Sequence, residues 1–220
     1  MRPSVTNRFV VGAGGHGRVV LEVWRAAEPG CVFKFADDDV KLHGSHIMDA
    51  EVAGPASIVQ DADGLAVLAI GNNPLRLALA ERLGPGTRWG RVIHPSATVM
   101  PSAEIGPGSV AFAGAVINTA AVLGAHVIVN TGVVVEHDCV LEDGVTVSPG
   151  ACMGGRVHLG RGCFISVGAT LAPRVRVGAG TIVGAGAVVV GDLPAGVLAY
   201  GVPARPMRSL DDGFDWRRVL

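Results

Sequence analysis

The stretch Glu136-His137-Asp138 places an imidazole between two carboxylates, and these residue types can transfer protons. Histidine titrates near neutral pH, so it can take a proton from a nucleophile, and a neighbouring carboxylate can fix its tautomer and stabilise the imidazolium. The competing interpretation is a solvated surface histidine, because His137 holds the fourth place of a repeat whose second place points inward. The residues alone leave both interpretations open.

A glycine-rich segment near the N-terminus could bind an anion. The segment GAGGHG, residues 12–17, follows an apolar strand predicted over residues 8–11 and precedes residues of helical spacing. Backbone N–H groups of such a turn can approach a phosphate at the N-terminus of a helix. The glycines could also serve only a tight turn.

Two further predicted strands, residues 31–36 and 65–70, end in polar residues. Asp37-Asp38-Asp39 follows the first and Gly71-Asn72-Asn73 the second, so all three motifs should meet at the carboxyl edge of a parallel sheet, where α/β sheets bind ligands. A glycine pattern followed by acids about twenty residues on is also typical of nicotinamide enzymes. Against that reading, the unit has only ninety residues and no second dinucleotide-binding half follows it.

A helix is expected directly after the third strand. Asn73 is predicted to cap it and Pro74 to be its first residue. Gly84 should end the helix, and its apolar face is predicted to consist of Leu75, Ala78, Leu79 and Leu83.

Residues 92–193 divide into seventeen hexads without a break. The second position of each is Ile, Val, Leu or Met, except at Ala111, and the sixth is mostly small. A period of six fits neither an α-helix nor one flat strand, but fits a coil of three short faces and eighteen residues per turn. One coil cannot bury its aliphatic face alone, so the coils must stack, giving between five and six turns.

Composition excludes several classes of protein. The chain has 220 residues, 49% hydrophobic and 5% aromatic, with 32 glycines and a net charge of −1. No broad basic surface for nucleic acid is implied, and there is neither an apolar run that could insert in a membrane nor a signal peptide, so a cytoplasmic location is expected.

The four cysteines lack CxxC spacing, and Cys139 and Cys163 fall on sixth positions, where a small core residue is needed.

The order of these motifs resembles one family. GAGGHG, an Asp cluster, IGNN and a hexapeptide repeat occur together in the bacterial sugar acetyltransferases that include nucleotide-4-amino-sugar N-acetyltransferases and the sialic acid O-acetyltransferase group. The resemblance covers about residues 8–207. Its most specific parts are NTGVVVEHDC, residues 130–139, and YGVPARPM, residues 200–207.

The resemblance implies a fold and an assembly. An α/β, Rossmann-like small domain that binds a nucleotide sugar would span residues 1–90. A left-handed parallel β-helix that carries acetyl transfer would span residues 91–207, and a tail residues 208–220. Members of the family use acetyl-CoA, act as homotrimers and combine residues of two subunits in each site. No metal is expected, because His126 and His158 occupy other hexad positions than His137 and should not converge with it.

Roles for individual residues also follow from the resemblance. His137 would be the general base, Asp138 would raise its basicity, and Gly155 would offer a backbone N–H to the acyl oxygen. The positions that match nucleotide-sugar contacts are Gly14, Gly15, His16, Asp37, Asp38, Gly71 and Asn72. The positions that match acetyl-CoA contacts are Thr146, Val167, Gly168 and Ala185.

The sequence therefore predicts an acetyl-CoA-dependent N-acetyltransferase for the 4-amino group of a UDP- or GDP-linked 4-amino-deoxy sugar. An O-acetyltransferase of the sialic acid type would use the same His137, and a non-catalytic nucleotide-binding trimer would need no base. The sequence does not decide between UDP and GDP, because a carboxylate can accept hydrogen bonds from either base. Nor does it assign residues 40–57 or the tail, where Phe214 and Trp216 favour packing.

Overall fold

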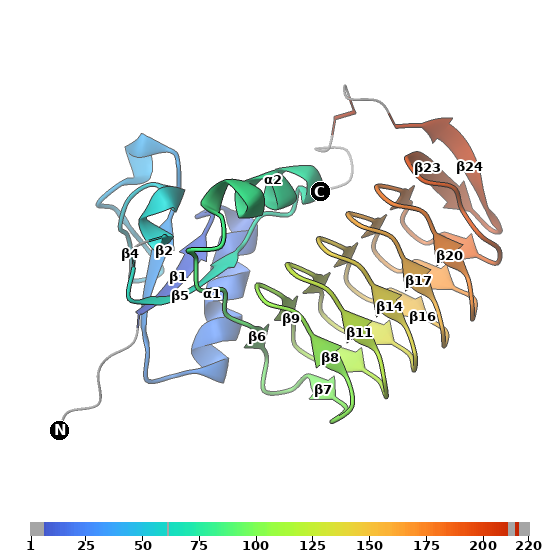
Figure 1. The fold of residues 1–220 in the computed structure, drawn as a ribbon, viewed down its shortest axis with the longest axis horizontal. Helices are drawn as coiled ribbons and strands as arrows, with labels where there is room; N and C mark the ends of the chain where they lie inside the picture. Colours follow the sequence, from blue (N-terminus) through green and yellow to red (C-terminus); the bar gives the residue numbers. More distant parts are fainter. Residues whose placement is uncertain (1–6, 61, 211–213, 216–220) are drawn as a thin grey trace.

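The chain forms a small α/β unit followed by a long prism of stacked coils (Figure 1). The computed structural model describes residues 7–60, 62–210 and 214–215. Trp216 of the predicted tail thus lies outside the described residues. No helix in these ranges is both long enough and apolar enough to span a membrane.

The α/β unit is built on a five-stranded sheet in the order β3-β4-β2-β1-β5, with β1 parallel to both β2 and β5. Two short 3-10 helices, Val40–Leu42 and Ala56–Val59, and the hairpin β3–β4 occupy the region that the sequence left unassigned. The bounds are β1 Asn7–Val11, α1 Gly15–Ala27, β2 Val32–Ala36, β3 His46–Ile47, β4 Ala50–Val52, β5 Gly64–Leu68 and α2 Asn73–Leu83.

The start of α2 differs from the prediction. Asn72, not Asn73, is the N-cap, and its Oδ1 accepts a hydrogen bond from the N–H of Leu75 at 2.9 Å. Asn73 is the first helical residue, and its side chain is fully buried against the prism instead. Gly84 ends the helix with φ +65°, as expected.

The prism contains seventeen two-residue strands that start every six residues, as the hexads predict. They are β6 Val92–Ile93, β7 Thr98–Val99, β8 Glu104–Ile105, β9 Val110–Ala111, β10 Val116–Ile117, β11 Val122–Leu123, β12 Ile128–Val129, β13 Val134–Val135, β14 Val140–Leu141, β15 Thr146–Val147, β16 Cys152–Met153, β17 His158–Leu159, β18 Phe164–Ile165, β19 Thr170–Leu171, β20 Arg176–Val177, β21 Ile182–Val183 and β22 Val188–Val189. The hairpin of β23 Val197–Gly201 and β24 Ala204–Ser209 closes its C-terminal end.

Each interior strand of the prism pairs in parallel with the strands three before and three after it, which lie eighteen residues away. Three flat faces result, and together they form a left-handed parallel β-helix. Face 1 contains β6, β9, β12, β15, β18 and β21; face 2 contains β7 and every third strand to β22; face 3 contains β8 and every third strand to β20. Corner 1–2, corner 2–3 and corner 3–1 are the turns that follow faces 1, 2 and 3.

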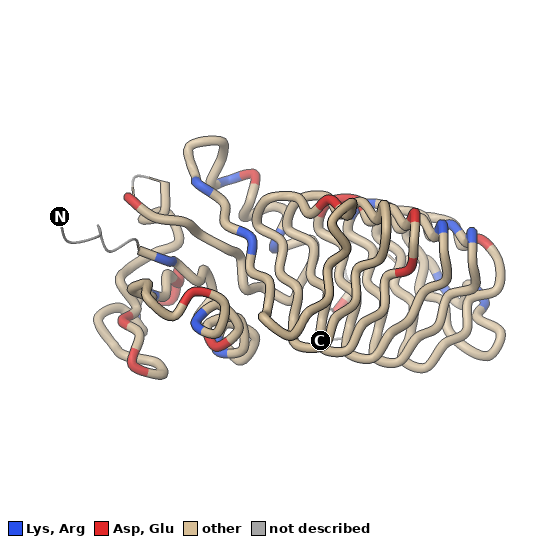
Figure 2. The backbone as a smooth tube through the Cα atoms, turned by 90° about the horizontal axis from the view of Figure 1, so that it is seen from below, with Lys and Arg blue, Asp and Glu red and all other residues tan. Residues whose placement is uncertain are grey.

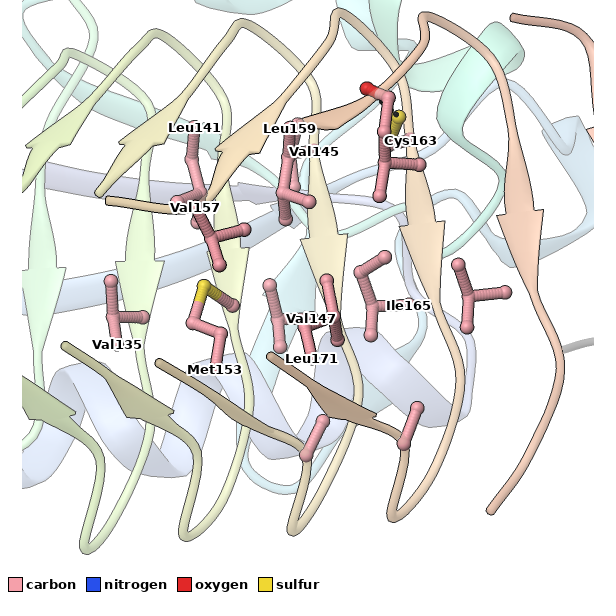
Figure 3. Close-up of a cluster of buried hydrophobic side chains, with 14 of the residues drawn as sticks. Val135, Leu141, Val145, Val147, Met153, Val157, Leu159, Cys163, Ile165 and Leu171 are labelled. Atoms are coloured by element: carbon pink, nitrogen blue, oxygen red, sulfur yellow. Dashed lines mark hydrogen bonds between the residues drawn. The ribbon is translucent and has the colours of Figure 1, made fainter. Parts of the chain in front are cut away.

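The second residue of every hexad points into the prism. Val135, Met153 and Leu171 come from three successive strands of face 2 and stack on one another in the core (Figure 3). Cys139 and Cys163 are buried there as expected, and burial raises the pKa of the Cys163 thiol to about 12. A continuous aliphatic core therefore replaces the layered core of a globular domain.

The α/β unit sits on face 1 of the first coils (Figure 1). Buried residues of α1, such as Leu21 and Trp24, form one apolar cluster with Val92, Val110 and Ile128 of face 1. The two units thus share a core, which fixes their relative position.

Ile165→Ala should lower the free energy of unfolding by about 2–5 kcal/mol, because it removes a fully buried side chain from a stack that cannot collapse. Glu104→Ala, at an exposed first position on face 3, should change stability by about 0.5 kcal/mol or less. Urea unfolding followed by circular dichroism checks both. Equal effects of the two substitutions would contradict the inward assignment of the second position.

Candidate functional site

The carboxyl edge of the α/β sheet opens into a cavity of about 520 Å³, here called the edge cavity. The loops after β1, β2 and β5 line it, as the strand order requires. Six of the seven residues matched to nucleotide-sugar contacts are among its walls: Gly14, Gly15, His16, Asp37, Asp38 and Gly71. The seventh, Asn72, caps α2 with its side chain and lies outside this cavity.

Glycine occurs at different positions of the first turn for different physical reasons. Gly17 lets α1 approach β1, because a side chain there would collide with the carbonyl of Gly12. Gly14 and Gly15 are exposed, and an added Cβ on Gly14 would meet no atom within 4 Å. The fold itself does not require glycine at position 14, so the bare backbone is free for the close approach of a ligand.

The two carboxylates of the edge cavity are already hydrogen-bonded within the chain. Asp37 accepts from the N–H of Ala13 at 2.8 Å and from that of Asp39 at 2.9 Å, so it ties the first turn to the second. Asp38 accepts from the N–H of Ala56 and pairs with Arg82, and these bonds hold the pKa of Asp38 below its usual range. Each carboxylate keeps further lone pairs for a ligand.

A second cavity, of about 420 Å³, lies between the α/β unit and the β-helix and is here called the junction cavity. His16 and Gly71 line both cavities, so the two adjoin. The β-helix contributes Ile128, Asn130, Thr146, Ser148, Pro149, Phe164 and Val167.

His16 is a partly buried histidine at this junction. Its ring stacks on Phe112 with 5.7 Å between centroids, and its Nε2 is buried without a hydrogen-bond partner among the described residues. Burial first, and the positive charge of Arg76 second, lower the pKa of His16 to about 4. The imidazole is therefore neutral at pH 7 and retains an unused polar atom.

His137 lies on corner 2–3, where its side chain is about half exposed. Its Nδ1 contacts Asp138 Oδ2 at 2.8 Å, so this carboxylate reaches the imidazole directly. This hydrogen bond, together with the charges of His137 and Arg156, holds the pKa of Asp138 low. With Nδ1 carrying the proton toward a carboxylate, Nε2 is the free basic atom.

Gly155 lies one coil further along the same corner, under the His137 ring. A Cβ at this position would lie 2.5 Å from His137 Nε2, so glycine is required if the imidazole is to stay where it is. In the described ranges the N–H of Gly155 donates to no acceptor. Gly155 is buried directly beneath the imidazole, so His137 Nε2 and this unused N–H are close neighbours.

The positions matched to acetyl-CoA do not all lie together. Val167, Gly168 and Ala185 form an exposed ladder on corner 1–2, where the N–H of Gly186 bonds to the carbonyl of Val167. Thr146 is on face 1 and buried; its hydroxyl donates to Asn73 and accepts from Arg76. Thr146 therefore lies outside the corner ladder but lines the junction cavity together with Val167.

Within one chain, His16 and His137 do not lie at the same site. His16 faces corner 1–2 through the junction cavity, whereas His137 is on corner 2–3 and lines neither cavity. No group of three or more His, Cys, Asp or Glu side chains within residues 7–60, 62–210 and 214–215 could hold a metal ion. Phe214 of the tail lines a third cavity beside α2, with the Arg208 guanidinium 5.1 Å from its ring centre.

Sequence reasoning missed Arg76, which is fully buried between the two units. A signal was available, since Arg76, Leu79 and Leu83 share the helical spacing of one face. Because charged residues are nearly always exposed, the sequence alone does not assign Arg76 to the buried face of α2.

Comparison with known proteins finds relatives of both units. Residues 7–83 match the family model of the PglD N-terminal domain. Over 110 residues the chain is 40% identical to UDP-N-acetylbacillosamine N-acetyltransferase of Bacillus subtilis (strain 168), a match that spans 47% of this chain and 50% of that enzyme. The chain thus covers about half the length of this curated relative.

Two solved structures match nearly end to end. The acetyltransferase domain of PglB from Neisseria gonorrhoeae in complex with acetyl coenzyme A is 37% identical, with a TM-score of 0.86 over 93% of this chain and 100% of that one. A histidine-to-alanine mutant of GDP-perosamine N-acetyltransferase from Caulobacter crescentus, in complex with CoA and GDP-perosamine, is 36% identical, with a TM-score of 0.86 over 94% and 99%. The chain therefore belongs to the bacterial family of nucleotide-sugar acetyltransferases that join a PglD-type N-terminal domain to a left-handed hexapeptide-repeat β-helix.

Proposed function

We propose that this protein transfers the acetyl group of acetyl-CoA to the 4-amino group of a UDP- or GDP-linked 4-amino-deoxy sugar. The observation that carries the proposal is the His137–Asp138 pair above Gly155. It occurs in a chain matched over nearly its whole length by structures in complex with acetyl coenzyme A or with CoA and GDP-perosamine. The thioester is already activated, so the enzyme needs a base and an oxyanion donor.

In the proposed reaction the amine nitrogen attacks the thioester carbonyl carbon and forms a tetrahedral adduct. His137 Nε2 takes the ammonium proton, while Asp138 stabilises the imidazolium through Nδ1. The N–H of Gly155 donates to the oxyanion. Collapse of the adduct breaks the C–S bond, and the thiolate of CoA leaves and is protonated.

The α/β unit, which we assign to residues 1–90, would hold the nucleotide part of the acceptor. The Gly14–Gly15 backbone is accessible to a diphosphate, and Asp37 and Asp38 keep lone pairs for ribose or base groups. His16 offers an unused nitrogen where the edge cavity meets the junction cavity. The β-helix, residues 91–207, would carry the donor along Val167, Gly168 and Ala185.

The separation of His16 and His137 on one chain supports a homotrimer whose sites combine two subunits. Charged residues gather on one side of the prism, and the other side carries almost none (Figure 2). The outward positions of face 2 are Thr98, Val116, Val134, Cys152, Thr170 and Val188, all uncharged. A face without charge is suited to burial against another subunit.

His137→Ala should lower kcat by about two to four orders of magnitude with little change in the affinity for acetyl-CoA, because the base acts in the chemical step. The assay measures thiol release from acetyl-CoA with UDP- and GDP-linked 4-amino-6-deoxy sugars, free amino sugars and sialic acid. His158→Ala, a histidine of face 3 that pairs with Glu142, is the control and should stay active. Equal loss of binding and rate in His137→Ala would make this histidine structural.

His16→Ala should raise KM for the nucleotide sugar about tenfold or more, since it removes a group that lines the proposed acceptor site. KM for acetyl-CoA should change little. Steady-state kinetics with each substrate varied in turn measures both. An unchanged KM for the nucleotide sugar would remove His16 from the acceptor site.

A further inference from the structure

Arg76 of α2 bonds to both structural units although it is fully buried. Its Nη1 donates to the carbonyl of Ile70 at 2.6 Å, directly before Gly71 in the loop after β5. Its Nε donates to the carbonyl of His126, and its Nη2 to the carbonyl of Gly144 at 2.8 Å and to the Thr146 hydroxyl. The guanidinium thus makes one hydrogen bond to the β5–α2 loop and three to the β-helix, and so joins the two.

The acceptors on the β-helix follow its repeat. His126, Gly144 and Gly162 occupy the same place on corner 3–1 of three successive coils, eighteen residues apart, with φ of 56°, 66° and 69°. Arg76 binds the first two carbonyls, and Asn73 Nδ2 binds the third at 3.0 Å. Helix α2 therefore lies across three coils and bonds to one equivalent carbonyl in each.

This packing leaves α2 little freedom to shift. A side chain on Gly144 would come within 2.6 Å of Leu77, so the helix lies directly on the corner. Within the described residues, Arg76 bonds only to uncharged oxygens and to no carboxylate. Burial lowers the pKa of Arg76 to about 9, which leaves it charged at neutral pH. A planar guanidinium spreads its N–H donors over three nitrogens and can reach carbonyls of both units, whereas a lysine has all its donors on one nitrogen.

The junction cavity is the space that this contact shapes. Gly71 on one wall follows the carbonyl that Arg76 holds, and Thr146 on the other wall accepts directly from Arg76. His16 lies close enough for the charge of Arg76 to favour its neutral form. Each contact places a group on the cavity wall, while the guanidinium itself lines neither cavity.

From these contacts we infer that Arg76 is a positioning residue for the acceptor: by bonding Ile70 and the corner carbonyls of two coils, it sets the distance between the nucleotide-holding loops and the β-helix wall. The inference rests on the proposed function for its substrate. It assigns Arg76 control over nucleotide-sugar affinity without contact with the sugar.

The test compares Arg76→Lys with Arg25→Lys in the full chain. Arg25 is an arginine of α1 whose guanidinium lies 5.9 Å from the Phe33 ring centre. Arg76→Lys should raise KM for the nucleotide sugar roughly ten- to hundredfold, since a small misplacement of binding groups has effects of this size. Its kcat and its KM for acetyl-CoA should stay within about threefold of wild type. Arg25→Lys should match wild type throughout.

A second readout does not depend on activity. Hydrogen–deuterium exchange of the amides in Asn73–Leu83 should become at least about tenfold faster in Arg76→Lys, because the helix loses its bonds to the corner. Loss of kcat at unchanged KM would mean that Arg76 only maintains the folded fraction, and would overturn the inference. If wild type acetylates no sugar, the proposed function fails, and unchanged exchange in α2 would overturn the positioning role independently.

Discussion

Each coil of the β-helix lies directly on the coil eighteen residues before it, because backbone hydrogen bonds join equivalent strands of successive turns. This register determines where each side chain points. The second residue of a hexad enters the core, and residues eighteen apart lie at the same place on a face or a corner. Groups distant in sequence thereby become neighbours without any tertiary loop. His137 and Gly155 meet for this reason, and a slip of one residue would send the imidazole to another surface.

The three corners of the prism carry different functional groups. Corner 2–3 carries the His137–Asp138 pair, corner 1–2 carries the exposed ladder proposed for acetyl-CoA, and corner 3–1 presents carbonyls to α2. The α/β unit contributes the phosphate-accessible turn and His16. Because Arg76 fixes this unit on the first coils, the junction cavity acquires one wall from each unit. Removing the Arg76 guanidinium from water costs free energy, which its hydrogen bonds to carbonyls partly offset. These same bonds hold the two units in a fixed arrangement.

Much of this organisation could be predicted from the sequence. The period of six predicted the seventeen faces and their inward second positions, and the structure adds that each face carries a two-residue strand at the start of its hexad. The apolar runs predicted the ends of β1 and β2 and the polar loops after all three strands, whereas β5 ends two residues before its predicted end. The N-cap of α2 was misplaced by one residue, because adjacent asparagines are equivalent caps until tertiary contacts bury Asn73. The role of Arg76 could not be predicted, as it depends on carbonyls that only the stacked coils bring into line. The proposed pairing of His16 of one subunit with His137 of another rests on the resemblance to a family of trimers, because no pattern within one chain encodes an assembly.

The most direct test of the account is complementation between two defective subunits. His137→Ala chains and His16→Ala chains would be co-assembled in equal amounts, and acetyl transfer would be measured at nucleotide-sugar concentrations far below the raised KM. If each site takes its base from one chain and its acceptor cavity from a neighbour, random trimers should recover about a quarter of wild-type activity. If both residues serve a site within one chain, every site stays defective, and the mixture would be no more active than the separate variants.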